Sequence, residues 1–330
     1  MDPFNFVLVQ DDIVEDMESK FGWRILSATP SPKGNGNLCR IMNTDNGPVF
    51  VKQFGKARNK KGLAKTREAL KYQDALHHAG GLCQPVYSYA GEPILVTKSE
   101  EEYMVSGVSK GQHIEAGEAN KDQMFSLGRA TGFMHAWMRE NLPSTQSLQW
   151  ELPSKEAMHK RLDKNLQETL AADHVRYAQA IEKQSRLLEQ LSLDELKAST
   201  PGWTHWDMHV DNLMFHEDRL ADILDFDRVH YVYPDFDISR ALLSCSYSAN
   251  TIPIDSIKAY VEGYTEYARL SEEQLVRSIK LTWYKEFKWV HAMYSTNKPM
   301  SRFIEELIWI GDHWHELQEV FIGACPSVSN

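Results

Sequence analysis

The sequence predicts an α+β chain of two lobes, in which a small antiparallel sheet precedes a larger, mainly helical lobe. Short alternating segments, separated by turns rich in glycine and asparagine, are concentrated in the first 105 residues. Beyond that point apolar residues recur at steps of three and four, which is typical of helices. The length of 330 residues also suits about two domains. We therefore expect residues 1–105 to form the first lobe and residues 106–330 the second.

Three consecutive strands are expected near the start of the first lobe. The segments Trp23–Ala28, Leu38–Met42 and Val49–Phe54 are short and are bounded by turn residues. The turns between them, Ser31–Asn37 and Thr44–Pro48, hold the glycine and asparagine residues that tight turns favour. This succession predicts an antiparallel sheet.

A helix and three shorter strands are expected in the rest of this lobe. Residues 56–79 contain few helix breakers and place Leu63, Leu70 and Leu76 on one side. Three short strands are predicted to follow, and they are Pro85–Ala90, Pro93–Thr97 and Tyr103–Val105. Strand signals then become rare.

The second lobe is predicted to be mostly helical. From about Lys121, apolar residues such as Met124 and Leu127 recur at helical steps. Residues 155–198 are polar and favour one or two amphipathic helices, which end before Pro201. Helices are expected to resume after residue 253 and to continue to the end, with many aromatic side chains.

Composition limits the classes of function. The chain is 42% hydrophobic and 25% charged, as in globular proteins with ample core. No run approaches the ~20 apolar residues that span a bilayer, and the first residues do not resemble a signal peptide, so no membrane partner is expected. Four scattered cysteines without a C-x-x-C pair argue against a zinc site or a disulfide framework, and they indicate a reducing, cytoplasmic location.

Charge is distributed unevenly along the chain. The net charge of −10 disfavours nucleic acid as a partner. Residues 1–105 hold 13 basic and 13 acidic residues, so the deficit lies in the remainder. An acidic second half would attract a cationic substrate, and a solvated acidic surface explains the same pattern equally well.

The segment Thr204–Phe215, THWDMHVDNLMF, brings candidate catalytic groups together. Asp207 is the candidate base, because phosphoryl transfer to a hydroxyl uses a carboxylate that orients the hydroxyl and takes its proton. Asn212 could offer its amide oxygen to a magnesium ion. After two short strands around a turn at residues 217–219, Asp225 would return beside Asn212 as a second magnesium ligand. The coincidence of these features predicts a phosphoryl-transfer enzyme rather than an ordinary loop.

The two histidines of this segment allow a different interpretation. His205 and His209 are four residues apart and close to carboxylates, so a His-x-Asp-x-His metal site is the alternative. No further histidine or cysteine cluster completes a zinc site nearby. We therefore expect both histidines to have structural roles, His205 by shaping the loop and His209 by supporting the groups around it.

Lys52 is the candidate phosphate anchor. It lies at the end of the apolar strand VFVKQF, where a lysine is costly unless it has a partner, and nucleotide phosphates would supply one. Glu68 in the following helix could hold the lysine in position, although Glu92 or another helix residue remains open. The alternative for Lys52 is an ordinary lysine on an edge strand.

The turn before this strand is a candidate phosphate loop. Gly34, Asn35, Gly36 and Asn37 lie between two predicted strands, and their backbone N–H groups could face an anion. The segment is neither a full G-x-G-x-x-G nor a Walker A motif. A plain hairpin turn explains it equally well.

At these residues the chain resembles the aminoglycoside phosphotransferase and choline kinase family, which is related in fold to protein kinases. The resemblance spans most of the chain, and its segments are GNGNLCRI (34–41), VFVKQF (49–54), LGRATGFMH (127–135), HWDMHVDN (205–212), DFD (225–227) and YPDFDIS (233–239). They are similar to the nucleotide loop, lysine strand, Leu-Gly…His helix, catalytic loop, metal segment and following P-x-x-D element of the family. Trp206 is a departure, because relatives often carry glycine there.

The resemblance implies a protein-kinase-like bilobal fold, with a nucleotide-binding N-lobe and a catalytic, substrate-binding C-lobe. It implies a kinase that uses ATP or GTP with Mg²⁺ and acts on a small molecule. Asp207 would be the base, Asn212 and Asp225 the magnesium ligands and Lys52 the phosphate anchor. Asp237 would be a structural carboxylate that supports the catalytic loop.

The resemblance also implies a hinge between the lobes at Tyr103–Val108. Backbone groups there, at Val105, Ser106 and Val108, would bind the purine. The partners implied are a nucleotide and a small-molecule substrate, with the protein a monomer or a homodimer.

The acceptor is the least specified part of the prediction. Candidate wall residues are Asp235, Trp283, Tyr284, Glu286, Trp309, Asp312 and Trp314. They would suit an amine-bearing substrate lodged between carboxylates and rings, whereas packing between helices explains the aromatic residues as well. An antibiotic kinase, including the amicoumacin-inactivating type, fits best, and a metabolic kinase of the homoserine or choline type is the alternative.

Two other classes of function stay open. A non-catalytic nucleotide-binding or coat protein could have the same fold, but the presence of Lys52, Asp207, Asn212 and Asp225 argues against it. A metal-dependent hydrolase built on the His/Asp cluster is more remote.

Overall fold

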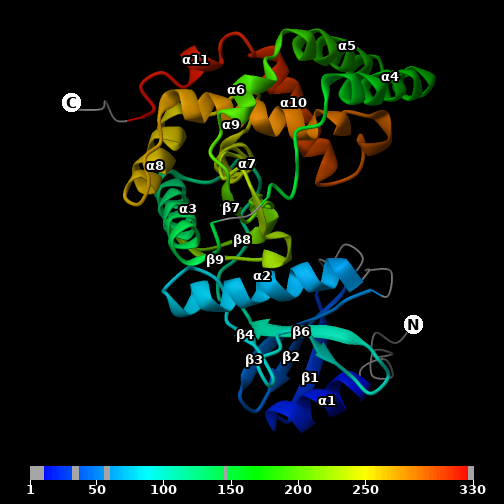
Figure 1. Ribbon diagram of the computed structural model, residues 1–330, viewed down its shortest axis with the longest axis vertical. Helices are drawn as coiled ribbons and strands as arrows, with labels where there is room; N and C mark the ends of the chain where they lie inside the picture. The colour runs from blue at the N-terminus through cyan, green and yellow to red at the C-terminus, as the bar shows by residue number, and fades with distance from the viewer. Residues whose placement is uncertain (1–10, 32–36, 56–59, 145–146, 326–330) are drawn as a thin grey trace. The chain divides into compact units, whose positions relative to one another are not determined.

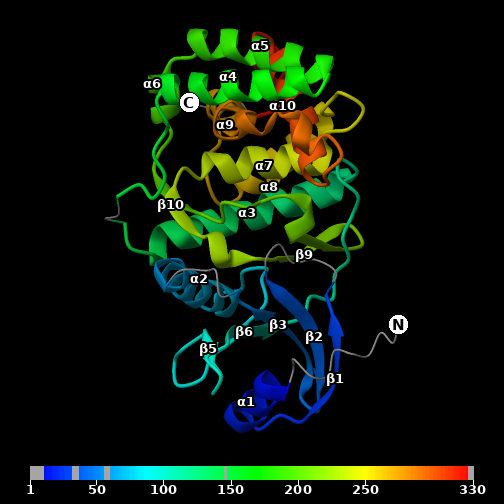
Figure 2. The same cartoon turned by 90° about the vertical axis from the view of Figure 1, so that its right-hand side faces the viewer.

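The computed structural model describes residues 11–31, 37–55, 60–144 and 147–325. The chain forms two compact units (Figures 1 and 2). The first comprises residues 1–111 and 221–228, and the second comprises residues 112–220 and 229–330. The return of residues 221–228 to the first unit was not predicted from the sequence.

The first unit is built on a six-stranded antiparallel sheet. Its strands are β1 (Ile25–Pro30), β2 (Leu38–Thr44), β3 (Gly47–Gln53), β4 (Val86–Tyr87), β5 (Leu95–Val96) and β6 (Glu102–Gly107). They follow the order β1-β2-β3-β6-β4, and β5 also pairs with β6. The predicted strands are confirmed, and the pairing of β3 with β6 brings Lys52 opposite Met104.

Each face of this sheet has its own core, because side chains alternate between the faces of a strand. On one face Val49 and Val51 pack with Ile13 and Met17 from helix α1 (Asp11–Phe21), which the sequence did not predict. On the other face lie apolar residues of helix α2 (Lys60–His78), and this cluster is Phe54, Leu63, Leu70, Val86, Ile94 and Met104. Lys52 alternates with Val51 and therefore lies on the α2 face.

Residues 221–228 are fixed to the first unit by hydrogen bonds. The Ile223 N–H donates to the carbonyl of Leu82 at 2.8 Å. The Gln84 amide donates to Asp222 Oδ1 at 2.7 Å, and the Ser109 hydroxyl donates to the other oxygen of Asp222. The short helix η2 (Phe226–Arg228) buries Phe226, which is 1% exposed, and packs against α2.

The second unit is mainly helical. Its helices are α3 (Lys121–Asn141), α4 (Lys155–Ala171), α5 (Val175–Gln190), α6 (Leu193–Lys197), α7 (Asp235–Ser246), α8 (Ile254–Thr265), α9 (Glu272–Glu286), α10 (Met300–Asp312) and α11 (Leu317–Val320), with the short turns η1 (Val210–Asn212), η3 (Phe287–Trp289) and η4 (Ala292–Tyr294). Helices α4 and α5 lie side by side (Figures 1 and 2). Two small strands, β7 (Gly202–Thr204) and β10 (His230–Val232), pair antiparallel on either side of the catalytic segment. Strands β8 (Leu213–His216) and β9 (Arg219–Ile223) form the predicted hairpin.

Helices α3 and α8 approach closely through glycines. A Cβ atom at Gly128 would lie 1.9 Å from the carbonyl oxygen of Tyr260, and one at Gly263 would lie 2.1 Å from that of Phe125. Only glycine permits such an approach of two backbones. The capping box of Asn120 with Gln123 fixes the start of α3. This explains the Leu-Gly element of the sequence as a packing feature.

Within the described ranges, none of the helices has the length and apolar character needed to cross a bilayer.

Candidate active site

Lys52 and Asp225 meet in the first unit, although 173 residues separate them in the sequence. The Lys52 ammonium donates to Asp225 Oδ1 at 2.8 Å and to Asp227 Oδ2 at 3.1 Å. Its side chain is only 10% exposed. Burial lowers the pKa of Lys52, but the two carboxylates outweigh this effect, so the pKa is raised and the lysine is charged.

Asp225 has a strained backbone conformation and a raised pKa. Its backbone has a φ of 63°, which a non-glycine residue adopts at a cost. Burial and the hydrogen bond with Asp227 raise the pKa of Asp225 to about 6, against the opposing effect of Lys52. The side chain is nevertheless 40% exposed. The two neighbouring carboxylates offer the oxygen ligands that a divalent cation prefers.

Asp227 was not among the residues predicted to form the site. Its side chain is 8% exposed and forms the second ion pair of Lys52. The signal was present in the sequence as the second aspartate of the D-F-D segment.

The expected pairing of Lys52 with Glu68 is not found. The Glu68 side chain is 57% exposed and lies 3.6 Å from Lys71 on the same helix. The buried positions of α2 near it are Thr66, Ala69 and Leu70, so Glu68 lies on the solvent side. Glu92, the other candidate, pairs with Arg67 at 2.8 Å. The aspartates of the D-F-D segment occupy the place that was predicted for a helix glutamate.

The predicted phosphate loop is only partly described. Gly34, Asn35 and Gly36 lie outside the described residues. Asn37 precedes β2, and its Oδ1 accepts the Gly55 N–H at 3.4 Å.

The predicted purine-binding segment is part of the sheet. Val105 is fully buried in the cluster between the sheet and α1. Ser106 is 6% exposed and donates its hydroxyl to the Gly107 carbonyl, while the Gly107 N–H donates to Pro85 O at 3.0 Å. Val108 follows the end of β6. This pairing rigidly positions the backbone at the end of the strand.

In the second unit, Asp207 and Asn212 are in direct contact. The Asn212 amide nitrogen donates to the Asp207 carbonyl at 2.9 Å and to Asp207 Oδ2 at 3.3 Å. The amide nitrogen is thus engaged within the loop, and the amide oxygen is the atom left to face a cation. The relation of Asn212 to Asp225 stays a prediction.

His209 contacts two aspartates of this loop. Its Nε2 lies 3.6 Å from Asp207 Oδ1, and its Nδ1 lies 3.2 Å from Asp211 Oδ2. Burial lowers the pKa of His209, but the hydrogen bonds with both aspartates outweigh it and the pKa is raised. The hydrogen bond from His209, together with Arg302 at 3.1 Å, holds the pKa of Asp211 well below its usual range.

Asp237 anchors the start of the catalytic segment. It is fully buried at the start of α7 and accepts the backbone N–H groups of His205 at 2.7 Å and Trp206 at 2.8 Å. His135 of α3 lies 3.1 Å from the same carboxylate. Trp206 has a φ of 68°, and these bonds fix that conformation directly before Asp207.

The alternative metal site on the histidines finds no support. Among the described residues, no group of three or more histidine, cysteine, aspartate or glutamate side chains is arranged to hold a metal ion. His205 is fully buried.

The predicted acceptor residues are mostly engaged in the core. Trp283, Tyr284, Trp309 and Trp314 are at most 7% exposed, and each packs against other aromatic rings. Burial of their large apolar surfaces stabilises the fold. Packing between helices, the alternative to a role in the acceptor site, therefore explains these aromatic residues.

The predicted acidic residues of the acceptor site are also paired. Asp235 is 2% exposed and accepts from Arg277 at 3.2 Å. Glu286 accepts from Arg240 at 2.7 Å, and Asp312 accepts from Lys183 at 2.6 Å. Their negative charge is therefore compensated within the protein.

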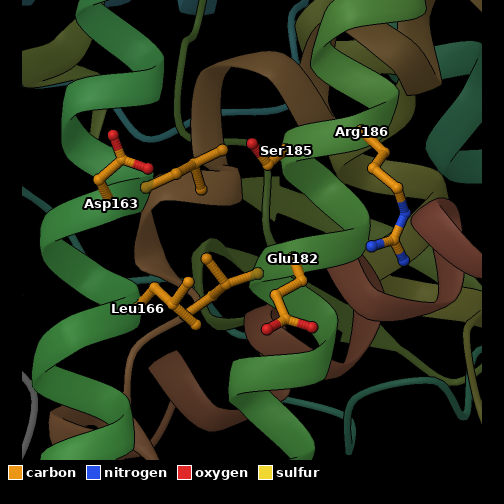
Figure 3. Close-up of a pocket in the computed structure, with 7 residues that line it drawn as sticks. Asp163, Leu166, Glu182, Ser185 and Arg186 are labelled. Atoms are coloured by element: carbon orange, nitrogen blue, oxygen red, sulfur yellow. The ribbon is translucent and has the colours of Figure 1, made fainter.

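Two hollows lie in the second unit. One of about 250 Å³ lies between α4 and α5, and its lining contains none of the predicted site residues. Figure 3 shows Asp163 and Leu166 on one helix and Glu182 and Ser185 on the other, with Arg186 directed away. The second, of about 550 Å³, lies between α5 and α10 and is lined by Trp309 and Asp312 among others.

Comparison with known proteins places this geometry in context. A family model described as phosphotransferase enzyme family matches residues 27–272. The search of curated proteins found no match.

Solved structures share the fold at low sequence identity. An aminopropanol kinase associated with a microcompartment is 14% identical, with a TM-score of 0.60 over 90% of this chain and 95% of that chain. An aminoglycoside phosphotransferase from Alicyclobacillus acidocaldarius is 16% identical, with a TM-score of 0.59 over 89% and 90% of the two chains. An amicoumacin kinase with bound AMP-PNP and Ca²⁺ is 14% identical, with a TM-score of 0.53 over 91% and 90%. The small antiparallel-sheet unit and the mainly helical unit are thus those of a protein-kinase-like fold.

Proposed function

Because the chain belongs to the phosphotransferase enzyme family, we propose that it transfers the γ-phosphoryl group of ATP or GTP to a hydroxyl of a small molecule. The observation that carries this proposal is the ion pair of Lys52 with Asp225. Two groups 173 residues apart meet at 2.8 Å, as an anchor for phosphates and a ligand for a divalent cation require.

The residues divide the chemistry between them. Asp207 orients the acceptor hydroxyl and takes its proton as the new P–O bond forms. Lys52 binds phosphate oxygens of the nucleotide, and Asp225 with the Asn212 amide oxygen would hold Mg²⁺. A cation held there would neutralise charge on the transferred phosphoryl group. Asp237 and His209 keep the catalytic loop in place through the contacts described above.

We propose an amine-bearing antibiotic as the acceptor. The acidic second half of the chain supports this proposal, as does the similarity in fold to an amicoumacin kinase and an aminoglycoside phosphotransferase. A small metabolic alcohol of the homoserine or choline type is the second candidate. It is favoured by the compensation of Asp235, Glu286 and Asp312 by basic side chains, which leaves less negative charge for a polyamine.

We take residues 1–105 as the nucleotide-binding lobe and residues 106–330 as the catalytic lobe. Cys39, Cys83 and Cys245 are buried free thiols, which supports a cytoplasmic enzyme.

The test is nucleotide-dependent phosphorylation of an acceptor panel, followed by mass spectrometry of the products. The panel contains aminoglycosides, amicoumacin, homoserine, choline and sugars. Asp207→Asn should lower product formation by about 10²–10⁴-fold, which is the usual contribution of a general base. Asp194→Asn is the control, because Asp194 is 91% exposed.

A failure of nucleotide binding in thermal-shift assays with Mg²⁺ would contradict the phosphotransferase proposal. Nucleotide binding without transfer to any acceptor would instead support a non-catalytic protein on this fold.

A further inference from the structure

Lys285 is a largely buried lysine whose charge is poorly compensated. It lies near the C-terminal end of α9, and its side chain is 14% exposed. The ammonium lies 3.5 Å from the ring centre of Phe236 and 4.2 Å from that of Trp206. These ring faces attract a cation but accept no conventional hydrogen bond from it.

One carboxylate contacts this ammonium, and the same carboxylate also forms an ion pair with an arginine. Within the described residues, Glu286 is the carboxylate in contact with Lys285, at 3.4 Å. The other oxygen of Glu286 accepts from Arg240 at the shorter distance of 2.7 Å. Lys285 has three N–H donors, so this single long contact leaves hydrogen-bonding capacity on a charged group.

Lys285 contacts the residue next to the proposed base. The indole that it contacts belongs to Trp206, the residue directly before Asp207. Burial lowers the pKa of Lys285 to about 8, although Glu286 and Asp207 act in the opposite direction. Asp207 is thus one of the two acidic groups whose charge acts on the ammonium.

Trp206 holds this arrangement in place. Its backbone N–H donates to Asp237 at 2.8 Å, and its ring packs against Phe236 at 4.7 Å and Trp150 at 5.5 Å. A side chain with this many contacts cannot turn away freely, so the lysine that lies on its ring has a fixed position relative to the catalytic loop.

We propose that Lys285 binds a carboxylate of the acceptor and thereby selects hydroxyl compounds that carry a carboxylate a few atoms from the reacting oxygen. This inference rests on the phosphotransferase function proposed above. A carboxylate carries one negative charge, which matches the single positive charge of Lys285. A phosphate dianion would be repelled more strongly by the negative charges of Asp207 and Glu286. An acceptor of the homoserine type meets the requirement and an aminoglycoside without an acidic group does not, so this inference favours the second of the two candidate acceptors proposed above.

A kinetic test uses three alcohols that share the same three-carbon spacing between the hydroxyl and the charged group or groups. L-Homoserine carries both an amine and a carboxylate, 4-hydroxybutyrate carries a carboxylate, and 3-amino-1-propanol carries an amine. The wild-type enzyme should prefer the two carboxylates. Lys285→Met should lower kcat/KM for them by about 10- to 100-fold, mainly through KM, because a charge-assisted hydrogen bond is lost.

Matched variants separate binding from structure. Lys285→Arg should retain most of the preference, because it keeps a cation at the site. Lys288→Met, three residues further on, should leave the ratio of carboxylate to amine acceptors unchanged. Equal losses for all three alcohols in Lys285→Met would overturn the proposal, because a purely structural role for Lys285 gives that result.

A binding measurement makes the outcome independent of turnover. Reductive methylation with ¹³C-formaldehyde labels the lysines, and the signal absent from Lys285→Arg belongs to Lys285. Addition of 4-hydroxybutyrate should shift this signal, and 3-amino-1-propanol should not. The same shift is expected in Asp207→Asn, in which phosphoryl transfer is strongly reduced, so a failure of the phosphotransferase function leaves this readout intact. No shift of the Lys285 signal with saturating 4-hydroxybutyrate would overturn the proposal.

Discussion

Lys52 in the first unit and Lys285 in the second are buried to nearly the same extent, with 10% and 14% of the side chain exposed. Their pKa values nevertheless move in opposite directions. Lys52 contacts two carboxylates, at 2.8 and 3.1 Å. Lys285 contacts two aromatic rings and one carboxylate, which lies at the longer distance of 3.4 Å. The neighbours, rather than the burial, therefore decide in which direction the pKa of each lysine moves.

The largest effect on activity is expected from replacing Lys52, the lysine that pairs with two carboxylates. Lys52→Met should lower kcat/KM by about 10²–10³-fold, which is typical of the loss of one preorganised electrostatic group. The physical reason is the loss of the phosphate anchor, combined with the mutual repulsion of Asp225 and Asp227. Initial-rate kinetics with varied nucleotide would measure it.

The control for this prediction is Lys71→Met, which removes an exposed lysine of α2. A Lys52→Met enzyme with wild-type kinetics would show that the ion pair has no part in catalysis.

Replacing Lys285, whose charge is poorly compensated, should stabilise the protein. At neutral pH, Lys285→Met should increase the free energy of unfolding by about 1–3 kcal/mol, because it removes the desolvation cost of a buried charge. The folded pKa of about 8 lies below the ordinary value of 10.5, so this cost is complete below pH 8 and vanishes as the pH rises towards 10.5. Urea unfolding at pH 7 and pH 10 should therefore show a gain at pH 7 that shrinks at pH 10. A gain of equal size at both pH values would show that Lys285 is not destabilised by its charge.

The effect of Mg²⁺ on Tm should depend on pH through Asp225, one of the two carboxylates that contact Lys52. Its folded pKa of about 6 is raised from 3.8, so the protonated form is favoured in the fold. That contribution to stability is complete below pH 3.8 and is lost as the pH rises through 6. A cation competes with this proton, so Mg²⁺ should raise Tm more at pH 7.5 than at pH 5. Differential scanning fluorimetry with Mg²⁺ or EDTA measures the difference, and Asp225→Asn should reduce it.

Local patterns explain what could be predicted from the sequence. Alternating apolar residues between turn residues define β2 and β3, and the His-x-Asp-x-His-x-x-Asn order places Asp207 beside Asn212 within one loop. Such features depend on neighbours along the chain. The hairpin of β8 and β9 was predictable for the same reason.

Features that depend on distant contacts could not be predicted in this way. The contact of Asp227 with Lys52 joins positions 175 residues apart, and that of Lys285 with Trp206 joins two elements of the second unit. The sequence does not state that Glu286 is neutralised by Arg240 on α7, so an acidic wall for amines was a reasonable expectation that the packing does not support. Burial and pairing, which decide availability, exist only in the folded chain.

The smallest effect tests the partner that was predicted for Lys52 and not found. Glu68→Gln should change kcat/KM by less than about twofold and the free energy of unfolding by less than ~0.5 kcal/mol, because exposed ion pairs contribute little. The Glu68 carboxylate is 57% exposed and 3.6 Å from Lys71, so nothing buried is left without a partner when its charge is removed. Asp227→Asn is the matched comparison, since it removes the same charge from a side chain that is 8% exposed and contacts Lys52 at 3.1 Å. If Glu68→Gln lowered activity as strongly as Asp227→Asn, the helix glutamate would have to reach Lys52 during the reaction, and the division of roles between α2 and the D-F-D segment would need to be reversed.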